Sequence, residues 1–326
     1  MGLVDLAGIA SLLICPRCGE RLIFDEALSC SSPSCMFSAP ATFSEVGPWP
    51  LLLDIERSVV QPEDLAPSSP VAAGETRWPV ERVPRWLRSL WKPANRVAAS
   101  NVDTLLSLLP APTPLVLVIG GGTIGNGTEG LYRDRRVRLV AFDIYGSQFT
   151  QFIADAHHVP IASNAVDAVV IQAVLEHVLD PGQVVREIHR VLTPSGLVYA
   201  ETPFLQQVHA GAWDFSRYTA SGHRYLFRAF EEIASGPVAG PGTQLLWTVD
   251  HVVRGILRSE LAGKMARGIC FWLRYLDRLI PPEFAIDSAS ACFFLGRSST
   301  HEMTPREILA YYRGAQHRNG PVSPGA

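Results

Sequence analysis

The stretch Leu115-Val-Leu-Val-Ile119, followed at once by Gly120-Gly-Gly122-Thr-Ile-Gly125, decides the fold class. An unbroken apolar run rich in β-branched residues is typical of a strand buried on both faces of a parallel sheet. Glycines directly after such a strand let the backbone turn sharply and bring its amides close to a ligand. The pattern therefore predicts the first strand and the ligand-binding turn of an α/β domain.

A second strand is predicted at Val137-Arg-Leu-Val-Ala-Phe142, and it ends in Asp143. An acidic residue at the tip of this strand can accept hydrogen bonds from both hydroxyl groups of a ribose. Gly120, Gly122 and Gly125 satisfy a G-x-G-x-x-G pattern, and Asp143 follows at the distance expected within one βαβ unit. These residues alone fit a nicotinamide dinucleotide as well as S-adenosylmethionine (SAM), so a dinucleotide oxidoreductase stays open.

The next segments favour SAM. They are Ala154-Asp155-Ala156, then Ser163-Asn-Ala-Val-Asp167-Ala-Val-Val-Ile171, and then Gln172-Ala-Val-Leu-Glu176-His177-Val178. From about Leu115 to Pro203 the chain resembles class I SAM-dependent methyltransferases of the type that methylate small molecules and quinones. The resemblance implies that Asp155 binds the adenine amino group and that Ala156 lends a backbone amide. With them, the predicted cofactor-binding residues are Gly120, Gly122, Asp143 and Gln172.

Two positions depart from the family's pattern. The family commonly has an acid two residues before the first glycine, where this chain has Val118, and Ile124 stands near a position where glycine is common. Both changes weaken the expected hold on the cofactor. A non-catalytic module that binds zinc and a nucleotide therefore stays open as an alternative.

The remaining elements complete a Rossmann-like α/β fold. Apolar residues recur at helical spacing from Pro181 to Leu192, a strand follows at Gly196–Glu201, and Ala289–Leu295 resembles the family's final antiparallel strand. We therefore predict a mostly parallel sheet with an antiparallel last strand, plus a small N-terminal zinc ribbon. The expected boundaries are 1–60 for the ribbon, 61–100 for a Pro-rich linker, 101–298 for the methyltransferase domain and 299–326 for a frayed tail.

Four cysteines predict a structural zinc site. They form the pairs Cys15-Pro-Arg-Cys18 and Cys30-Ser-Ser-Pro-Ser-Cys35, with a hairpin expected between them. Four thiolates suit tetrahedral zinc and leave no position open for chemistry, whereas a redox Cys-x-x-Cys pair would leave the second pair unexplained. The segment Cys15–Asp54 resembles the zinc-ribbon proteins that activate tRNA and protein methyltransferases. It is also similar to the ribbon fused to some bacterial rRNA guanine methyltransferases.

The catalytic candidates follow the fifth strand. The block from Glu201 to Arg224 is dense in polar and aromatic residues, and it resembles the Asp-x-x-Arg-Tyr-Thr segment of methyltransferases found with polysaccharide biosynthesis. A general base is needed only for a protonated acceptor such as a hydroxyl. We expect His209 to be that base, oriented by Asp214, with Arg217 and Tyr218 shaping the acceptor pocket. In the alternative reading, Asp214 and Arg217 merely pair in a structural loop. His177 is a further catalytic candidate, although its ring could simply cap or pack.

Composition limits the partners. The chain has 28 Lys and Arg against 31 Asp and Glu, which gives no general attraction to nucleic acid. An RNA methyltransferase that grips RNA with its ribbon is the main alternative to an enzyme for a small-molecule, glycan or lipid-linked acceptor. The linker offers basic and aromatic residues for such contacts, but we favour a connector whose tryptophans pack on the main domain. These residues are Trp78, Arg82, Arg85, Trp86, Arg88, Trp91 and Lys92.

Two apolar stripes at helical spacing, within residues 245–257 and 265–280, are interpreted as helices that cover the sheet. The alternative is a peripheral membrane contact that serves a lipid-linked acceptor. No apolar run is long enough to span a bilayer, and the N-terminus lacks a basic signal-peptide region. We therefore expect a cytoplasmic protein, with its oligomeric state left open.

Overall fold

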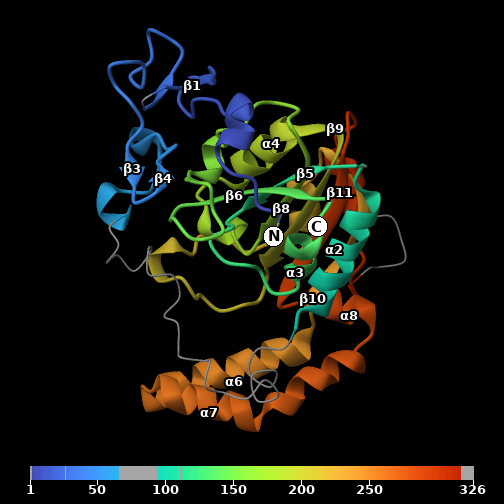
Figure 1. The fold of residues 1–326 in the computed structure, drawn as a ribbon. Coiled ribbons are helices and arrows are strands. Elements are labelled where there is room, and N and C mark those ends of the chain that lie inside the picture. The colour runs from blue at the N-terminus through green and yellow to red at the C-terminus, as the bar shows by residue number, and fades with distance from the viewer. Residues whose placement is uncertain (1, 26, 66–93, 111, 317–326) are drawn as a thin grey trace.

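The computed structural model describes residues 2–25, 27–65, 94–110 and 112–316, and a seven-stranded sheet of order β10-β11-β9-β8-β5-β6-β7 lies at its centre (Figure 1). All neighbouring strands run parallel except β11, which is antiparallel to both β9 and β10. The predicted Rossmann-like fold with an antiparallel last strand is confirmed. The strands are β5 (Leu115–Ile119), β6 (Arg138–Asp143), β7 (Phe152–Ile153), β8 (Val166–Gln172), β9 (Leu192–Pro203), β10 (Phe230–Ala239) and β11 (Ala291–Ser298).

Helices cover both faces of this sheet because successive side chains of a strand point to opposite faces. Val116 and Val118 of β5 pack in one cluster with Leu105 of α2. Leu117 and Ile119 lie in the other cluster, which also holds Ile188 of α4. The first face carries α2 (Arg96–Leu108) and α3 (Glu129–Arg133), and the second carries α4 (Pro181–Val191) and α5 (Ala220–Leu226). The expected two-sided burial of β5 is confirmed.

Side-chain caps set where two of these helices begin. Asp180 accepts a hydrogen bond from the Gln183 amide at 2.9 Å and is followed by Pro181 at the first helical position, so α4 begins as predicted. Asn95 accepts from the Ala98 amide at 2.9 Å, and α2 therefore begins at Arg96. Residues 96–100, which were predicted to belong to the linker, therefore form the first part of this helix.

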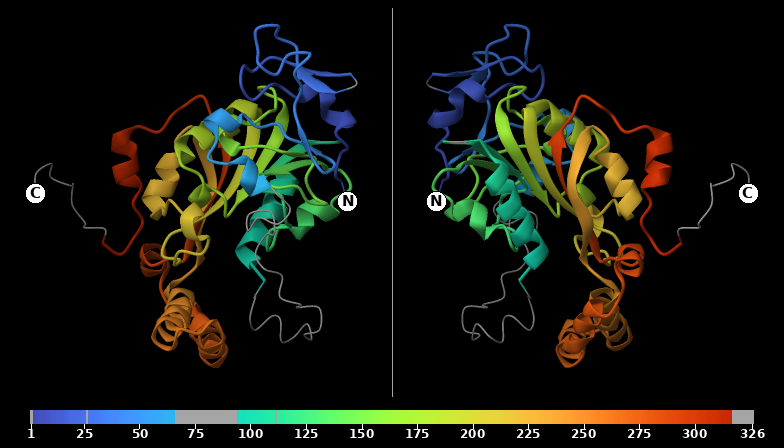
Figure 2. Two further views of the ribbon diagram at one scale, coloured as in Figure 1. Left: turned by 90° about the vertical axis from the view of Figure 1, so that its left-hand side faces the viewer. Right: turned by 90° about the vertical axis from the view of Figure 1, so that its right-hand side faces the viewer.

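The N-terminal segment forms a small module on the sheet (Figure 2). The expected hairpin is present as β1 (Leu22–Phe24) and β2 (Leu28–Cys30), and a second short pair follows, β3 (Glu45–Val46) and β4 (Trp49–Pro50). Ile9, Leu13 and Leu52 are buried in the same cluster as the strands of the large sheet. The module therefore completes the core of the α/β domain. Three 3₁₀ helices accompany it: η1 (Ala7–Leu12), η2 (Ile55–Arg57) and η3 (Pro62–Leu65).

The two apolar stripes do not cover the sheet, so that interpretation is wrong. Helices α6 (Pro241–Leu257) and α7 (Glu260–Ile269), with the 3₁₀ helix η8 (Phe271–Arg278), fold into a hairpin that projects beyond one end of the sheet (Figures 1 and 2). The chain returns to β11 through α8 (Pro282–Asp287). Among the described residues, none of the helices has the length and apolarity needed to cross a bilayer.

The C-terminal segment also differs from the prediction. Helix α9 (Pro305–Tyr311) carries a capping box in which the Thr304 hydroxyl accepts from the Glu307 amide and the Glu307 carboxylate accepts from the Thr304 amide. The Tyr311 hydroxyl lies 2.6 Å from the Ser235 hydroxyl of β10. The expectation of a frayed tail is therefore wrong for residues 299–316. The tryptophans and basic residues of the predicted linker at 78–92 lie outside the described residues.

Candidate active site

The glycine turn, residues Gly120 to Gly125, follows directly after β5. Gly120 has a φ of 75°, a conformation that favours glycine, and its amide donates to the Phe142 carbonyl at 3.0 Å. A Cβ atom at Gly120 would lie 2.2 Å from Cγ2 of Val174, the residue that follows β8 by two positions. The turn is thus held between the carboxyl ends of β6 and β8, where open α/β sheets bind ligands.

Asp143 lies beside this turn. Its Oδ2 accepts from the Gly122 amide at 2.9 Å, and its Oδ1 accepts from the Ile144 amide at 2.7 Å. Burial raises the pKa of Asp143 to about 6, against the opposing effect of these two hydrogen bonds. A Cβ atom at Gly122 would lie 2.5 Å from the Tyr145 ring, so this ring stands against the turn. The structure therefore brings together three of the predicted cofactor residues, Gly120, Gly122 and Asp143.

Asp155 and Ala156 follow β7 and are both buried. Oδ1 of Asp155 accepts from the His157 amide at 2.9 Å and lies 2.6 Å from Nδ1 of the same residue, while Oδ2 accepts from the Ser58 hydroxyl. Burial would raise the pKa of Asp155, but the His157 and Ser58 contacts lower it below its usual value. Ser58 belongs to the segment after β4, so the N-terminal module reaches the predicted adenine site.

Gln172, at the end of β8, leads to a polar cluster that the sequence analysis missed. Its Nε2 donates to Oε2 of Glu201 at 2.7 Å and to the Asn126 carbonyl at 3.1 Å. Asn95 donates to both oxygens of Glu201, at 3.1 and 3.0 Å. Burial raises the pKa of Glu201 despite these bonds. An acid after an apolar strand is the signal that had identified Asp143, and it could have identified Glu201. No signal marked Asn95, which lay in the predicted linker.

The acceptor-side candidates meet in the loop between β9 and α5. Asp214 forms an ion pair with Arg217, whose Nη2 donates to Oδ2 at 2.6 Å. Oδ2 also accepts from the His209 amide at 3.0 Å and lies 3.4 Å from His209 Nδ1. Burial would raise the pKa of Asp214, but these contacts lower it to about 2. Asp214 therefore takes part in both predicted arrangements, since it pairs with Arg217 and also contacts the His209 ring.

His177 lies next to His209, and both face an acid that the sequence analysis did not select. The two imidazole rings meet edge to face with centroids 4.9 Å apart. Oε1 of Glu176 lies 3.7 Å from His177 Nε2 and 3.9 Å from His209 Nε2. Burial raises the pKa of Glu176 to about 8 and lowers that of His177. The Leu-Glu-His-Val stretch contains Glu176 and could have marked it as a site residue, but the stretch indicated only a resemblance to the family.

Tyr218 joins this region through its backbone, since its amide donates to the Pro203 carbonyl at the end of β9 at 3.3 Å. Burial raises the pKa of the Tyr218 hydroxyl. A cavity of about 420 Å³ lies nearby, between the start of α5 and the segment after α9. Its lining includes Phe204, Thr219 and Tyr312 but none of the predicted site residues.

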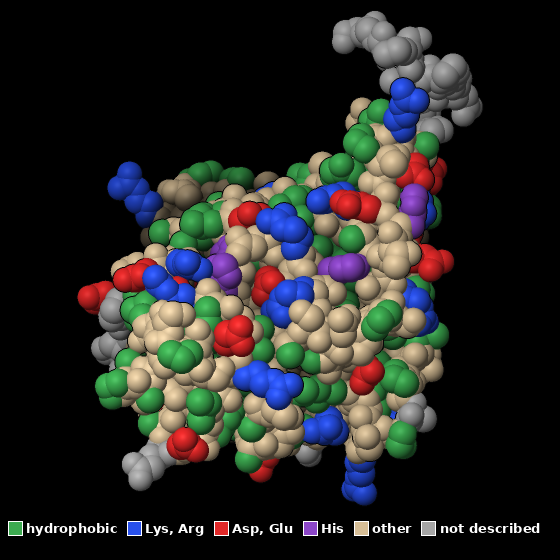
Figure 3. All heavy atoms as spheres, turned by 90° about the horizontal axis from the view of Figure 1, so that it is seen from above, with side chains coloured by type: hydrophobic (Ala, Val, Ile, Leu, Met, Phe, Trp, Pro, Cys, Tyr) green, Lys and Arg blue, Asp and Glu red, His purple; other side chains and the backbone are tan. Residues whose placement is uncertain are grey.

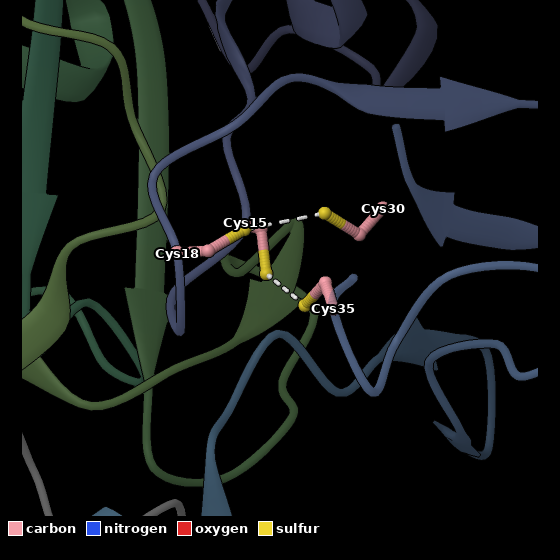
Figure 4. Close-up of side chains that lie close together, drawn as sticks. All are labelled: Cys15, Cys18, Cys30 and Cys35. Atoms are coloured by element: carbon pink, nitrogen blue, oxygen red, sulfur yellow. Dashed lines mark hydrogen bonds between the residues drawn. The ribbon is translucent and has the colours of Figure 1, made fainter. Parts of the chain in front are cut away.

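The four N-terminal cysteines converge (Figure 4). Sγ atoms of Cys15 and Cys35 lie 3.7 Å apart, those of Cys18 and Cys30 lie 3.4 Å apart, and all four atoms lie within 4.8 Å of one another. Zn–S bonds of about 2.3 Å in a tetrahedron separate sulfurs by roughly 3.8 Å. Gly19, with a φ of 77°, closes the first knuckle by donating its amide to the Cys15 carbonyl at 2.9 Å. The cluster therefore fits the geometry of tetrahedral zinc.

On the face of the molecule seen from above, Lys and Arg side chains are interspersed with Asp and Glu side chains (Figure 3). Alternating charges of this kind do not form the continuous basic field that attracts a nucleic-acid backbone.

Residues 119–200 match the family profile described as a methyltransferase domain. No curated protein sequence matches the chain. Solved structures with a similar fold include the [4+2]-cyclase SpnF, at 16% identity and a TM-score of 0.42, covering 64% of this chain and 84% of that one. Phosphoethanolamine N-methyltransferase 2 of Haemonchus contortus has 15% identity and a TM-score of 0.42, over 62% and 53% of the two chains.

A third similar structure is 1,6-didemethyltoxoflavin-N1-methyltransferase of Burkholderia thailandensis, at 14% identity and a TM-score of 0.39, over 65% and 82% of the two chains. Identities and scores this low carry no information about the acceptor. The profile match is more specific because its bounds enclose the glycine turn, Asp143, Asp155 and Gln172. Residues 119–200 of this chain thus match the methyltransferase domain family.

Proposed function

We propose that this protein is a SAM-dependent methyltransferase that methylates a hydroxyl oxygen of a small-molecule, glycan or lipid-linked acceptor. The observation that carries the proposal is the half-buried Asp143 carboxylate, which is hydrogen-bonded to the glycine turn at the carboxyl edge of β5 and β6. When bound, SAM supplies an electrophilic methyl group on a sulfonium.

In this proposal the residues at the glycine turn hold the cofactor. Asp143 accepts hydrogen bonds from the ribose hydroxyls, and the amides near Gly120 and Gly122 approach the ligand without side chains in the way. Asp155 and Ala156 hold the adenine edge. The unpaired Oε1 of Gln172, which is buried without a hydrogen-bond partner among the described residues, offers an acceptor beside the turn.

The acceptor lies at the side where His177 and His209 meet, with Arg217 and Tyr218 shaping its pocket. Methyl transfer is an in-line displacement, so the enzyme mainly aligns the reacting groups and excludes water. A hydroxyl must also lose its proton, and the Nε2 atoms of the two histidines are the available acceptors. Asp214 positions the His209 ring because Arg217 holds its carboxylate in place. The Cys15, Cys18, Cys30 and Cys35 cluster would hold structural zinc, and four reduced thiolates suit a cytoplasmic protein.

One observation favours a second candidate, the non-catalytic nucleotide-binding module. Ser58 already donates to the Asp155 oxygen that an adenine amino group would use, and Val118 stands where the family commonly has an acid. In such a module the nucleoside would bind weakly and no acceptor would be methylated.

Isothermal titration with S-adenosylhomocysteine tests the proposal, with NADH as the parallel ligand. We expect saturable binding of the nucleoside by the wild type, at least tenfold weaker binding by Asp143→Ala, and no binding of NADH. Asp103→Ala, on the exposed side of α2, is the matched control and should bind like the wild type. Preferential binding of NADH would contradict the proposal. Absence of nucleoside binding would favour the non-catalytic module.

A further inference from the structure

Glu176 is a buried carboxylate that accepts no hydrogen bond from another described residue. Its side chain is 0% exposed, and apart from an electrostatic contact with its own backbone amide, neither oxygen accepts a hydrogen bond from any described residue. Burial of an unpaired carboxylate costs several kcal/mol, so such groups normally gain a cation or a proton. The Nε2 atoms of His177 and His209 lie 3.7 and 3.9 Å from its Oε1 atom.

His177 presents a lone pair to this carboxylate, and the His209 ring lies beside it. Nδ1 of His177 lies 2.7 Å from the Trp213 carbonyl, which can only accept, so the proton of the neutral ring sits on Nδ1 and Nε2 is free of it. Nδ1 of His209 lies 3.4 Å from the Asp214 carboxylate, which likewise only accepts. The His177 ring is thus anchored through Nδ1 on a carbonyl oxygen, and Nδ1 of His209 faces a carboxylate. This arrangement is typical of histidines that bind metal through Nε2.

We propose that Glu176, His177 and His209 bind a divalent transition-metal ion of the zinc and iron(II) class. Two imidazoles and one carboxylate are the ligands of several open metal sites, in which further positions stay available to water or substrate. Bonds of about 2.1 Å in a tetrahedron place ligand atoms roughly 3.4 Å apart, close to the 3.7 and 3.9 Å between the Glu176 oxygen and the two nitrogens. The proposal that this site binds a metal ion does not depend on the proposed function. A role for the ion in methyl transfer rests on that function: with both Nε2 atoms bound to it, the ion would orient the acceptor oxygen and lower the pKa of its hydroxyl, in place of a histidine acting as the base.

Metal content of the full-length protein tests this site separately from the cysteine cluster. The protein is stripped of metal and reloaded with Zn²⁺, and its zinc content is measured by inductively coupled plasma mass spectrometry. The wild type should hold two equivalents of zinc, and Glu176→Gln should hold one. With Co²⁺, the thiolate charge-transfer band should persist in Glu176→Gln, whereas Cys18→Ser should lose it. His301→Asn, on the exposed C-terminal segment, should match the wild type.

Equal stoichiometry and affinity in the wild type and Glu176→Gln would overturn the proposal. If Glu176→Gln unfolds, His209→Asn gives the same test, with a loss in Zn²⁺ affinity of tenfold or more expected at this site. Nucleoside binding is measured in parallel, so that failure of the metal site and failure of the proposed function are told apart.

A different observation carries a second inference, on the projecting hairpin of α6, α7 and η8. Large apolar side chains stand exposed at helical spacing along it, among them Ile256 at 74%, Ile269 at 72% and Leu279 at 78%. The outer row of α7 and η8 continues through Leu261, Met265, Ile269, Trp272 and Leu279. Monomeric proteins rarely leave so long an apolar row in water.

The charges of the hairpin are basic, unlike those of the chain as a whole. Residues 241–280 hold six Lys and Arg against three Asp and Glu, whereas the whole chain has 28 against 31. All three acids are paired within the hairpin, and Glu260 lies 3.2 Å from the Lys264 ammonium. Asp250 pairs with Arg254 and Arg267 at 3.2 and 3.5 Å, and Asp277 accepts from the Gly242 amide at 2.6 Å. An apolar row flanked by cations fits the headgroup boundary of an anionic bilayer.

We infer that the hairpin lies on an anionic membrane surface. The full-length protein should co-sediment with vesicles that contain phosphatidylserine, and at least tenfold less with pure phosphatidylcholine vesicles. The triple variant Ile256→Asp, Ile269→Asp and Leu279→Asp should lose most of the binding. Leu309→Asp, an equally exposed apolar residue on α9, should keep it. Lack of vesicle binding by the wild type, or a dimer that the triple variant dissociates, would overturn the inference.

Discussion

Leu52 tests whether the N-terminal module and the α/β domain share one core. Leu52 is 0% exposed, lies in the cluster that contains β5 and β8 side chains, and donates its amide to the Ile153 carbonyl of β7 at 2.8 Å. Truncation of a buried leucine to alanine costs about 2–5 kcal/mol, since it removes apolar contacts and leaves a cavity. At about 2 °C per kcal/mol for a chain of this size, Leu52→Ala should lower the Tm of the whole chain by roughly 4–10 °C.

Differential scanning calorimetry measures this shift, with Ile23→Ala as the control. Ile23 lies on β1 of the same module but is 40% exposed, so its truncation should change the free energy of unfolding by no more than about 0.5 kcal/mol. We expect a single transition that moves only in Leu52→Ala. A separate early transition, with the main one unmoved, would refute the shared core, as would equal shifts in the two variants.

Three further predictions concern the glycine turn, the acceptor-side ion pair and the cysteine cluster. Gly120→Ala places a Cβ 2.2 Å from Val174 at a positive φ and should destabilise the protein by about 1–3 kcal/mol in urea unfolding, while the exposed Gly255→Ala should not. The pKa of Asp214 is lowered to about 2, so its ionised form contributes stability above its ordinary value near 3.8, and this contribution is lost as the pH falls toward 2. Arg217→Met should therefore lower the Tm at pH 5 and approach the wild type near pH 2; a constant difference would contradict this. Cys18→Ser should lower both zinc content and Tm, and a chelator should bring the wild-type Tm down to that of the variant.

The central sheet could be predicted because its signals are contiguous in the sequence. An apolar run, a glycine turn and an acid after the next strand specify β5, β6 and their connection within about thirty residues. The stripe from Pro181 to Leu192 specified α4 in the same way. Interactions between distant segments left no such signal. Ser58 and Asp155 are 97 residues apart, and nothing in either neighbourhood indicates that one donates to the other.

Contacts between distant segments also explain why the candidate site could be predicted only in part. Glu176 and His177 lie in a stretch that resembles a known family, but their neighbour His209 comes from the loop after β9. The two histidines could be predicted from their residue type, whereas the importance of Glu176 depends on its complete burial, which no local pattern indicates. Burial of a loop residue is decided by the segments that fold over it, here those around Trp213 and Phe215.

The projecting hairpin shows why an apolar stripe alone does not tell what covers it. Its helices approach closely at two glycines, because a Cβ at Gly242 would lie 2.4 Å from the Leu273 carbonyl oxygen, and one at Gly263 would lie 2.4 Å from Oδ1 of Asp250. Within residues 241–280, Leu246 and Leu273 are the buried large apolar side chains, and Ile256 and Ile269 stand outside. Much of the hydrophobic stripe that the sequence reveals is thus the outer surface of the hairpin, and its burial requires something that the described residues do not place there.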